Sequence, residues 1–221
     1  MAVDNKNHQL LKLKVDIISW LKFYKIDNIQ LIENEEYGYI VDVLGSVNLF
    51  EKDLKKIEVK FNTINGAFDC SMNELKALNG CPHRVNGNFF CYSNLLTNLV
   101  DGPEYVKNDY LCFANQITCL LGVPEIINGD FDCSFNKIKK LQYCPKNIKK
   151  IFLFNDNLIE SLSNMDFPTV VGGKVFLHNN LLSEQLLCLN DFQKIKVLLE
   201  KEHFSNTIGV KKNKNNNLLK I

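Results

Sequence analysis

The sequence predicts an α/β repeat solenoid in which short parallel β-strands stack into one sheet and a helix covers each end. Two observations carry this prediction. Four cysteines recur at a constant interval of 21 residues, and five other positions keep the same interval around them. Self-similarity at about 20 to 50 residues is typical of stacked repeat architectures. With 221 residues, 46% of them hydrophobic, the chain is long enough to bury the core of one elongated domain.

Six positions define the repeat. An aromatic residue stands two positions before each cysteine, an asparagine three after it, a branched aliphatic residue five after it, a leucine eight after it and a proline twelve after it. Degenerate copies on both sides extend the pattern to seven units over residues 43–182. In the four complete units the columns are Phe68, Phe89, Tyr110 and Phe131; Cys70, Cys91, Cys112 and Cys133; Asn73, Asn94, Asn115 and Asn136; Leu75, Leu96, Ile117 and Ile138; Leu78, Leu99, Leu120 and Leu141; Pro82, Pro103, Pro124 and Pro145.

Each unit carries the pattern of one short strand. Phe89 and Cys91 alternate with Asn88, Phe90 and Tyr92, and this period of two suits a strand with one face turned inward. A parallel pair needs a crossover of at least about a dozen residues. A unit of 21 residues supplies that crossover without room for a long helix. We therefore expect a parallel sheet on the concave face and a mostly irregular convex side.

The core of the unit resembles that of a known repeat family. Residues 68–75, with the sequence FDCSMNEL, resemble the L-x-L-x-x-N-x-L core of leucine-rich repeats, and the resemblance covers roughly residues 43–182. The longer pattern NGxFxCSxNxLxxLxGxP, as in residues 65–82, is similar to short repeats of this family in bacteriophage and other viral proteins and in bacterial effectors. The resemblance implies a leucine-rich-repeat-like solenoid that binds another protein. Val85, Val106 and Ile127 depart from the family pattern because they stand four residues, not three, before the aromatic position.

The recurring residues have structural interpretations. The aromatic column should form the centre of the core, and the cysteine column should fill space as small apolar side chains. A metal site is not expected, because the chain has no Cys-x2-Cys pair and no paired histidines. The asparagines stand where the chain turns, so their side chains should donate to and accept from backbone groups that would otherwise be buried unpaired.

Both ends of the chain are predicted to cap the stack. Residues 1–42 should form an amphipathic helix around Gln9 to Lys25, with Trp20 in the core, and then a hairpin of residues 29–32 and 39–43. Residues 183–206 should form a second helix, whose first turn resembles a capping box of Asn190 and Gln193. The polar residues 207–221 read as a flexible tail.

The side chains that flank each inward pair should point outward and form a binding face. Contiguous exposed apolar residues usually mark interaction sites, and the aspartates among them would suit a lysine or arginine of a partner. The nine predicted contact residues are Phe90, Tyr92, Asp109, Leu111, Phe113, Asp130, Asp132, Leu153 and Phe176. A terminal segment or a second copy of the chain, as in a homodimer, would also cover such a face. Calcium at the aspartates is the next alternative, and a pair of acids for glycoside hydrolysis ranks last.

The sequence favours a non-catalytic protein that binds a partner protein. The 26 basic and 25 acidic residues nearly cancel, so no overall field attracts nucleic acid or an acidic membrane. No signal peptide, no membrane span of about 18 apolar residues, no phosphate loop and no catalytic constellation can be recognised. We expect a cytoplasmic protein without cofactors, encoded by a phage or mobile element, that occupies a host protein surface, for instance as a defence inhibitor such as an anti-CRISPR. The alternatives are a nucleic-acid-binding protein that uses the lysines of residues 137–150 and 211–214, and an effector-type recognition module.

Overall fold

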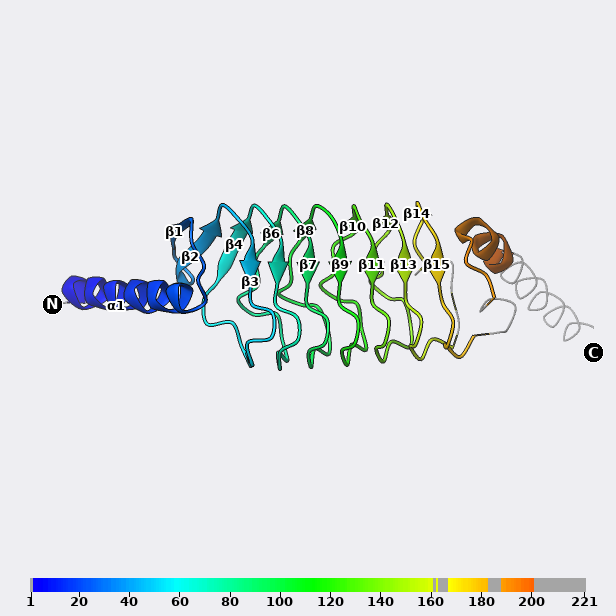
Figure 1. Cartoon of the computed structure of the whole chain (residues 1–221), viewed down its shortest axis with the longest axis horizontal. Helices are drawn as coiled ribbons and strands as arrows, with labels where there is room; N and C mark the ends of the chain where they lie inside the picture. Colours follow the sequence, from blue (N-terminus) through cyan, green and yellow to red (C-terminus); the bar gives the residue numbers. More distant parts are fainter. Residues whose placement is uncertain (1, 161, 163–166, 183–187, 201–221) are drawn as a thin grey trace, which may run out of the picture.

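The computed structural model is an elongated parallel β-solenoid (Figure 1). It describes residues 2–160, 162, 167–182 and 188–200, with side chains from residue 9 onward. Helix α1 (Ala2–Phe23) lies at one end of the stack and a helix over residues 192–200 at the other. The predicted tail of residues 207–221 lies outside the described residues. The α/β solenoid with helices at its two ends, as predicted from the sequence, is confirmed.

Seven parallel strands form the main sheet at the predicted positions. Each strand has two residues, and paired residues on neighbouring strands are 21 positions apart, except at the last pair, where Phe152 aligns with Val175. In sheet order from the last strand to the first these are β15 (Val175–Phe176), β13 (Phe152–Leu153), β11 (Phe131–Asp132), β9 (Tyr110–Leu111), β7 (Phe89–Phe90), β5 (Phe68–Asp69) and β3 (Val47–Asn48).

A second row of strands runs beside the main sheet, although the sequence was predicted to form only one strand per coil. These strands are β4 (Phe61–Ile64), β6 (Arg84–Val85), β8 (Tyr105–Val106), β10 (Ile126–Ile127), β12 (Asn147–Ile148) and β14 (Val170–Val171). They belong to two sheets, β1-β2-β4-β6-β8 and β10-β12-β14, and form the upper row in Figure 1. In most coils three residues separate the two strands, so the chain turns a sharp corner between them. Elsewhere in the coils the described residues form turns and bends, with no helix between residues 44 and 182.

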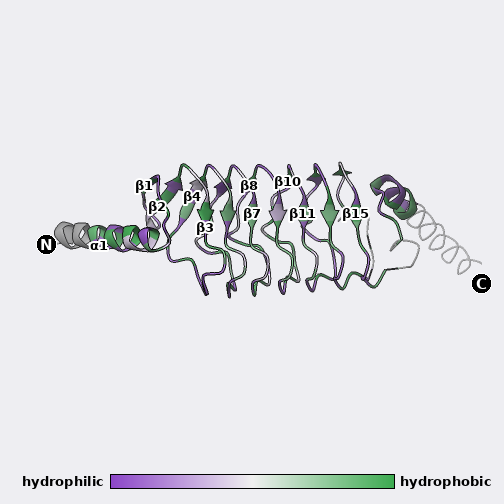
Figure 2. Cartoon of the chain, in the orientation of Figure 1, coloured by the Kyte–Doolittle hydropathy of each residue, from purple (hydrophilic) through white to green (hydrophobic). Residues whose placement is uncertain are grey.

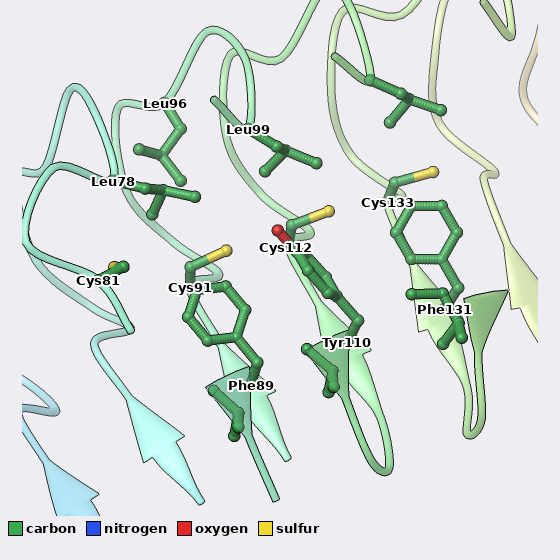
Figure 3. Packing of buried hydrophobic residues seen from close by; sticks show 14 of the residues in the cluster. Leu78, Cys81, Phe89, Cys91, Leu96, Leu99, Tyr110, Cys112, Phe131 and Cys133 are labelled. Atoms are coloured by element: carbon green, nitrogen blue, oxygen red, sulfur yellow. The ribbon is translucent and has the colours of Figure 1, made fainter. Parts of the chain in front are cut away.

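A column of aromatic rings fills the centre of the stack (Figure 3). Phe68, Phe89, Tyr110, Phe131 and Phe152 are fully buried, and the centroids of successive rings are 6.0, 5.0, 5.9 and 5.6 Å apart. Burial of one such side chain contributes about 1.5 to 3 kcal/mol relative to its exposure. Hydrophobic and hydrophilic residues are interspersed along the coils (Figure 2). In each main-sheet strand the first side chain is buried and the second is partly buried or exposed. The predicted inward and outward faces of these strands are therefore confirmed.

The cysteine column packs beside the rings as small apolar side chains. Cys70, Cys91, Cys112 and Cys133 are fully buried and unpaired by disulfides. Burial raises the pKa values of Cys91, Cys112 and Cys133 well above that of an ordinary thiol. The pKa of Cys70 is also raised, and a hydrogen bond with Cys81 contributes most to that increase. These thiols therefore stay protonated, which agrees with the structural interpretation of the column.

The asparagine column joins each coil to the one before it. Asn94 Nδ2 donates to the carbonyl oxygen of Cys91 in its own coil and to that of Cys70 in the preceding coil, at 3.2 and 3.0 Å. Its Oδ1 accepts the backbone N–H of Leu75, also in the preceding coil, at 3.0 Å. Asn115, Asn136 and Asn157 repeat this arrangement, so the predicted pairing of the turn's backbone groups is confirmed.

The residue before each of these asparagines has a left-handed backbone conformation. None of these residues is a glycine, and their φ values lie between 52° and 56°. An L-residue in this region costs roughly 1 to 2 kcal/mol. The residues are Met72, Ser93, Ala114, Phe135, Asp156 and Asn179. The asparagine hydrogen bonds hold the turn in a conformation that its own sequence does not favour.

The N-terminal cap has two parts. Strands β1 (Ile29–Asn34) and β2 (Gly38–Val43) form the predicted hairpin, and β2 pairs with β4 in parallel, so the hairpin extends the second row. Helix α1 begins earlier than predicted and projects along the long axis of the stack (Figure 1). Its Ile17 and Leu21 are buried, whereas Leu11 and Val15 are exposed. Among the side chains of α1 that the structure describes, the buried ones thus lie in its C-terminal half, and Trp20 lies at the border of the core, partly buried.

The C-terminal helix packs on the last coil through Phe192, Ile195 and Leu199, which are buried. The ring of Phe192 stacks on Phe167 with 5.7 Å between centroids. Asp191 Oδ1 accepts the backbone N–H of Lys194 at 3.0 Å. The residue that caps this helix is thus Asp191, and the predicted capping box of Asn190 and Gln193 was wrong by one position.

The hydroxyl of Tyr110 is buried without a hydrogen-bond partner among the described residues. An unpaired buried hydroxyl costs about 1 to 3 kcal/mol, and the neighbouring rings of the column are phenylalanines. We expect Tyr110→Phe to raise the free energy of unfolding by about 1 kcal/mol, measured by urea denaturation. The matched control is Tyr143→Phe at an exposed ring, which should change nothing. A loss of stability in Tyr110→Phe would contradict the packing described here.

Loss of one asparagine should leave several backbone groups of two coils unpaired. We expect Asn115→Ala to lower the free energy of unfolding by about 1 to 3 kcal/mol. Asn108→Ala, at an exposed asparagine of the same coil, should stay within about 0.5 kcal/mol of the wild type. Equal effects of the two substitutions in chemical denaturation would show that the column does not hold the coils together.

Candidate binding face of the main sheet

The outer face of the main sheet presents one aligned residue from each strand. The pairing register places Phe90 beside Leu111, Leu111 beside Asp132, Asp132 beside Leu153, and Leu153 beside Phe176. We call these five residues the central column. All five are partly buried by their neighbours. The sequence predicted that this surface would be concave, but the strands stand in a nearly straight row in Figure 1. We therefore call it the outer face of the main sheet.

Aromatic rings gather near β7 and β9 of this face. The rings of Tyr92 and Phe113 stack with their centroids 4.5 Å apart and are nearly parallel, with 5° between their planes. The ring of Phe90 lies 6.3 Å from that of Tyr92. With Leu111, these residues form a continuous apolar surface that we call the aromatic cluster. The structure thus brings together four of the nine predicted contact residues.

Asp109 and Asp130 have partners within the chain. Asp109 Oδ1 accepts the backbone N–H of Asp130 at 2.9 Å, and Asp130 Oδ1 accepts that of Ile151 at the same distance. Lys150 Nζ lies 3.5 Å from Asp109 Oδ1. A Cβ at Gly129 would collide with the Asp109 carboxylate, so this glycine makes room for it. At Asp109 a lysine of the chain itself supplies the expected cation, whereas Asp130 has a backbone hydrogen bond in its place.

Asp132 has a different environment because it lies between two leucines of the central column. Its Oδ1 accepts the backbone N–H of Ser134 at 2.9 Å and the Ser134 hydroxyl at 2.6 Å. Burial raises the pKa of Asp132, an effect that the bonds from Ser134 oppose and the charge of Asp130 reinforces. Among the described residues, no lysine or arginine forms an ion pair with Asp132. This carboxylate therefore has hydrogen bonds but no counter-charge.

Leu153 and Phe176 continue the central column beyond Asp132 and complete the predicted set. They are separated from the aromatic cluster by that one carboxylate. The contact between Lys150 and Asp109 could not be predicted from the sequence, because the two residues are two coils apart in the chain. Nor does any sequence pattern indicate that Asp109 and Asp130 bind backbone amides of the following coils.

Two hollows lie away from the outer face, near the N-terminal end. A cleft of about 620 Å³ has Trp20, Phe23 and Tyr24 among its lining residues, together with lysines of the first coil. A smaller one of about 330 Å³ includes His83 and Glu104, whose Nε2 and Oε2 atoms lie 3.1 Å apart. In the described part of the chain, no three or more His, Cys, Asp or Glu side chains are placed to hold a metal ion. The calcium alternative at the aspartates therefore has no geometric support.

The lysines proposed for nucleic-acid binding lie on the surface. All six lysines of residues 137–150 are exposed, and this segment contains no aspartate or glutamate. One of them, Lys150, forms an ion pair with Asp109. The second stretch, residues 211–214, lies outside the described residues.

Comparison with protein families, with curated proteins and with solved structures gives no match to this chain. None of the helices in the described residues has both the length and the apolar character needed to cross a membrane. The geometry of the outer face is therefore the main basis for a functional conclusion.

Proposed function

We propose that this protein is a non-catalytic solenoid that binds a partner protein through the outer face of its main sheet. The observation that carries the proposal is the aromatic cluster. Four apolar side chains from two adjoining coils gather there, three of them in ring contacts and the fourth on the strand next to Phe90, and all are only partly buried. Contiguous apolar surface of this kind is uncommon on a protein that faces only water.

The way the cluster is held also favours binding. The side chains stand on strands of the stacked core or directly after them, so little conformational entropy remains to be lost when a partner covers them. Aromatic side chains dominate the energetic centres of protein interfaces. Phe90, Tyr92 and Phe113 are the residues that we assign to that centre, with Leu153 and Phe176 as a second contact area.

The biological setting follows from the resemblance of the repeat. Short repeats similar to this one occur in phage and other viral proteins, which supports an origin in a phage or mobile element and the occupation of a host protein, such as a component of a defence system. An effector-type recognition module is the related alternative. The eight cysteines are all free, which supports a reducing compartment such as the cytoplasm.

Removal of the three rings should weaken partner binding strongly. We expect the triple variant Phe90→Ala, Tyr92→Ala and Phe113→Ala to lose at least about tenfold in affinity, since each ring fills the centre of the interface. The partner would be identified by affinity capture from cells that naturally contain the protein, purified, and titrated calorimetrically. Circular dichroism would verify that the variant retains its fold.

The matched control removes a similar amount of apolar surface elsewhere. Leu95, Val100 and Leu121 are exposed on the coils outside the main sheet, and their combined substitution by alanine should leave the affinity unchanged. If the ring variant binds the partner as tightly as the control variant does, the outer face is not the binding site.

Nucleic-acid binding is the second candidate, because the six exposed lysines of residues 137–150 form an acid-free stretch. We expect only weak retention of single-stranded RNA in filter binding, no tighter than the roughly 10⁻⁴ to 10⁻⁶ M typical of non-specific contacts. A much tighter affinity that falls steeply with salt, and that substitution of Lys146 and Lys149 by alanine removes, would favour this candidate instead.

A further inference from the structure

The central column has the order phenylalanine, leucine, aspartate, leucine, phenylalanine. Its members come from five successive strands and lie in register. Asp132 is thus the middle member, with two apolar residues on each side along the stack. An occupant that covers the apolar members also covers this carboxylate and removes its remaining water.

A covered carboxylate needs a positive charge from the occupant. Within the described part of the chain, the Asp132 carboxylate receives its hydrogen bonds from Ser134 and pairs with no lysine or arginine. Taking an unpaired charge out of water costs several kcal/mol, whereas a lysine or arginine in hydrogen-bond contact offsets that cost. Lys150, a lysine two coils after Asp109, pairs with that carboxylate at 3.5 Å and not with Asp132.

A second copy of the chain does not meet this requirement. A two-fold arrangement centred on the column would bring Asp132 against Asp132 of the other copy, and like charges repel at such distances. In a shifted arrangement, Asp132 would face one of the apolar members. No member of the column is cationic. Charge complementarity therefore points to a different protein as the occupant.

The spacing of the column matches an α-helix better than an extended segment. Parallel strands stand about 4.8 Å apart, so the four steps from Phe90 to Phe176 span about 19 Å. One helical turn rises about 5.4 Å, so four turns span about 22 Å. Same-side residues of an extended chain repeat at about 6.8 Å, and four such steps span about 27 Å. A helix laid along the stack keeps one side chain near each strand, whereas an extended chain loses register after one or two steps.

We propose that the central column binds an amphipathic helix of the partner protein, laid along the axis of the stack, with a lysine or arginine in the middle of its apolar stripe. This inference rests on the proposed function and specifies its partner. The apolar residues of the helix contact Phe90 and Leu111 on one side and Leu153 and Phe176 on the other. The central cation reaches the carboxylate of Asp132.

The test uses a displayed library of 18-residue amphipathic helices, selected on the full chain. The apolar stripe is fixed as leucine except at its middle position, which is randomised over arginine, lysine, glutamine, leucine and glutamate. We expect arginine and lysine to be enriched at that position. A selected arginine helix should bind Asp132→Asn at least tenfold more weakly than the wild type in fluorescence anisotropy.

Asp69→Asn is the matched control, because Asp69 makes the same bonds to Ser71 that Asp132 makes to Ser134 but lies at the edge of the apolar stretch. This variant should change the affinity less than twofold. Asp132→Leu provides a second, reciprocal test, since it should reverse the selection and favour leucine at the middle position of the helix.

Two results would overturn the inference. One is the selection of neutral central residues whose binding is insensitive to Asp132→Asn, although Phe113→Ala weakens it. The other is the absence of any helix whose binding depends on the outer face. In both cases the capture experiment with the ring variant decides the proposed function separately, because it requires no helix and no cation.

Discussion

Each buried asparagine side chain ties the turn of its own coil to the coil before it, because its amide nitrogen donates to carbonyls of both coils and its oxygen accepts an N–H of the earlier one. The turn places a non-glycine residue such as Ser93 or Ala114 in the left-handed region. The network must outweigh that local cost at every coil. The same network fixes the point at which each main-sheet strand ends, and therefore also the direction of the outer side chains on that strand.

The same periodicity has opposite consequences inside and outside the stack. Inside, each column repeats one residue type, so rings stack on rings and thiols lie beside thiols. Outside, the members of a column differ, as leucine and aspartate do at Leu111 and Asp132. The interior demands self-complementarity between coils, whereas the outer positions must only tolerate their neighbours. Recognition can therefore be encoded on the outer face at little cost to folding.

The main sheet could be predicted from the sequence because six columns repeat at a fixed interval. The second row of strands could not be predicted, since a strand of two residues such as β6 (Arg84–Val85) is too short to show an alternating pattern. The only sequence feature that corresponds to this second row is the repeated aliphatic residue four positions before each aromatic, namely Val85, Val106 and Ile127. Among the outer residues, the aromatic cluster followed from simple alternation. The backbone bonds of Asp109 and Asp130 depend on the corner between the strands, which only three-dimensional geometry reveals.

Because each strand of the main sheet pairs only with the strands of the adjacent coils, the molecule is modular along its axis. A duplication or deletion of one complete 21-residue segment would join equivalent positions and keep every interior column continuous. Such an event would insert or remove all the outer residues of one coil in a single step. Recombination between repeats of this gene can thus lengthen, shorten or rearrange the recognition surface one whole coil at a time, without disturbing the interior columns.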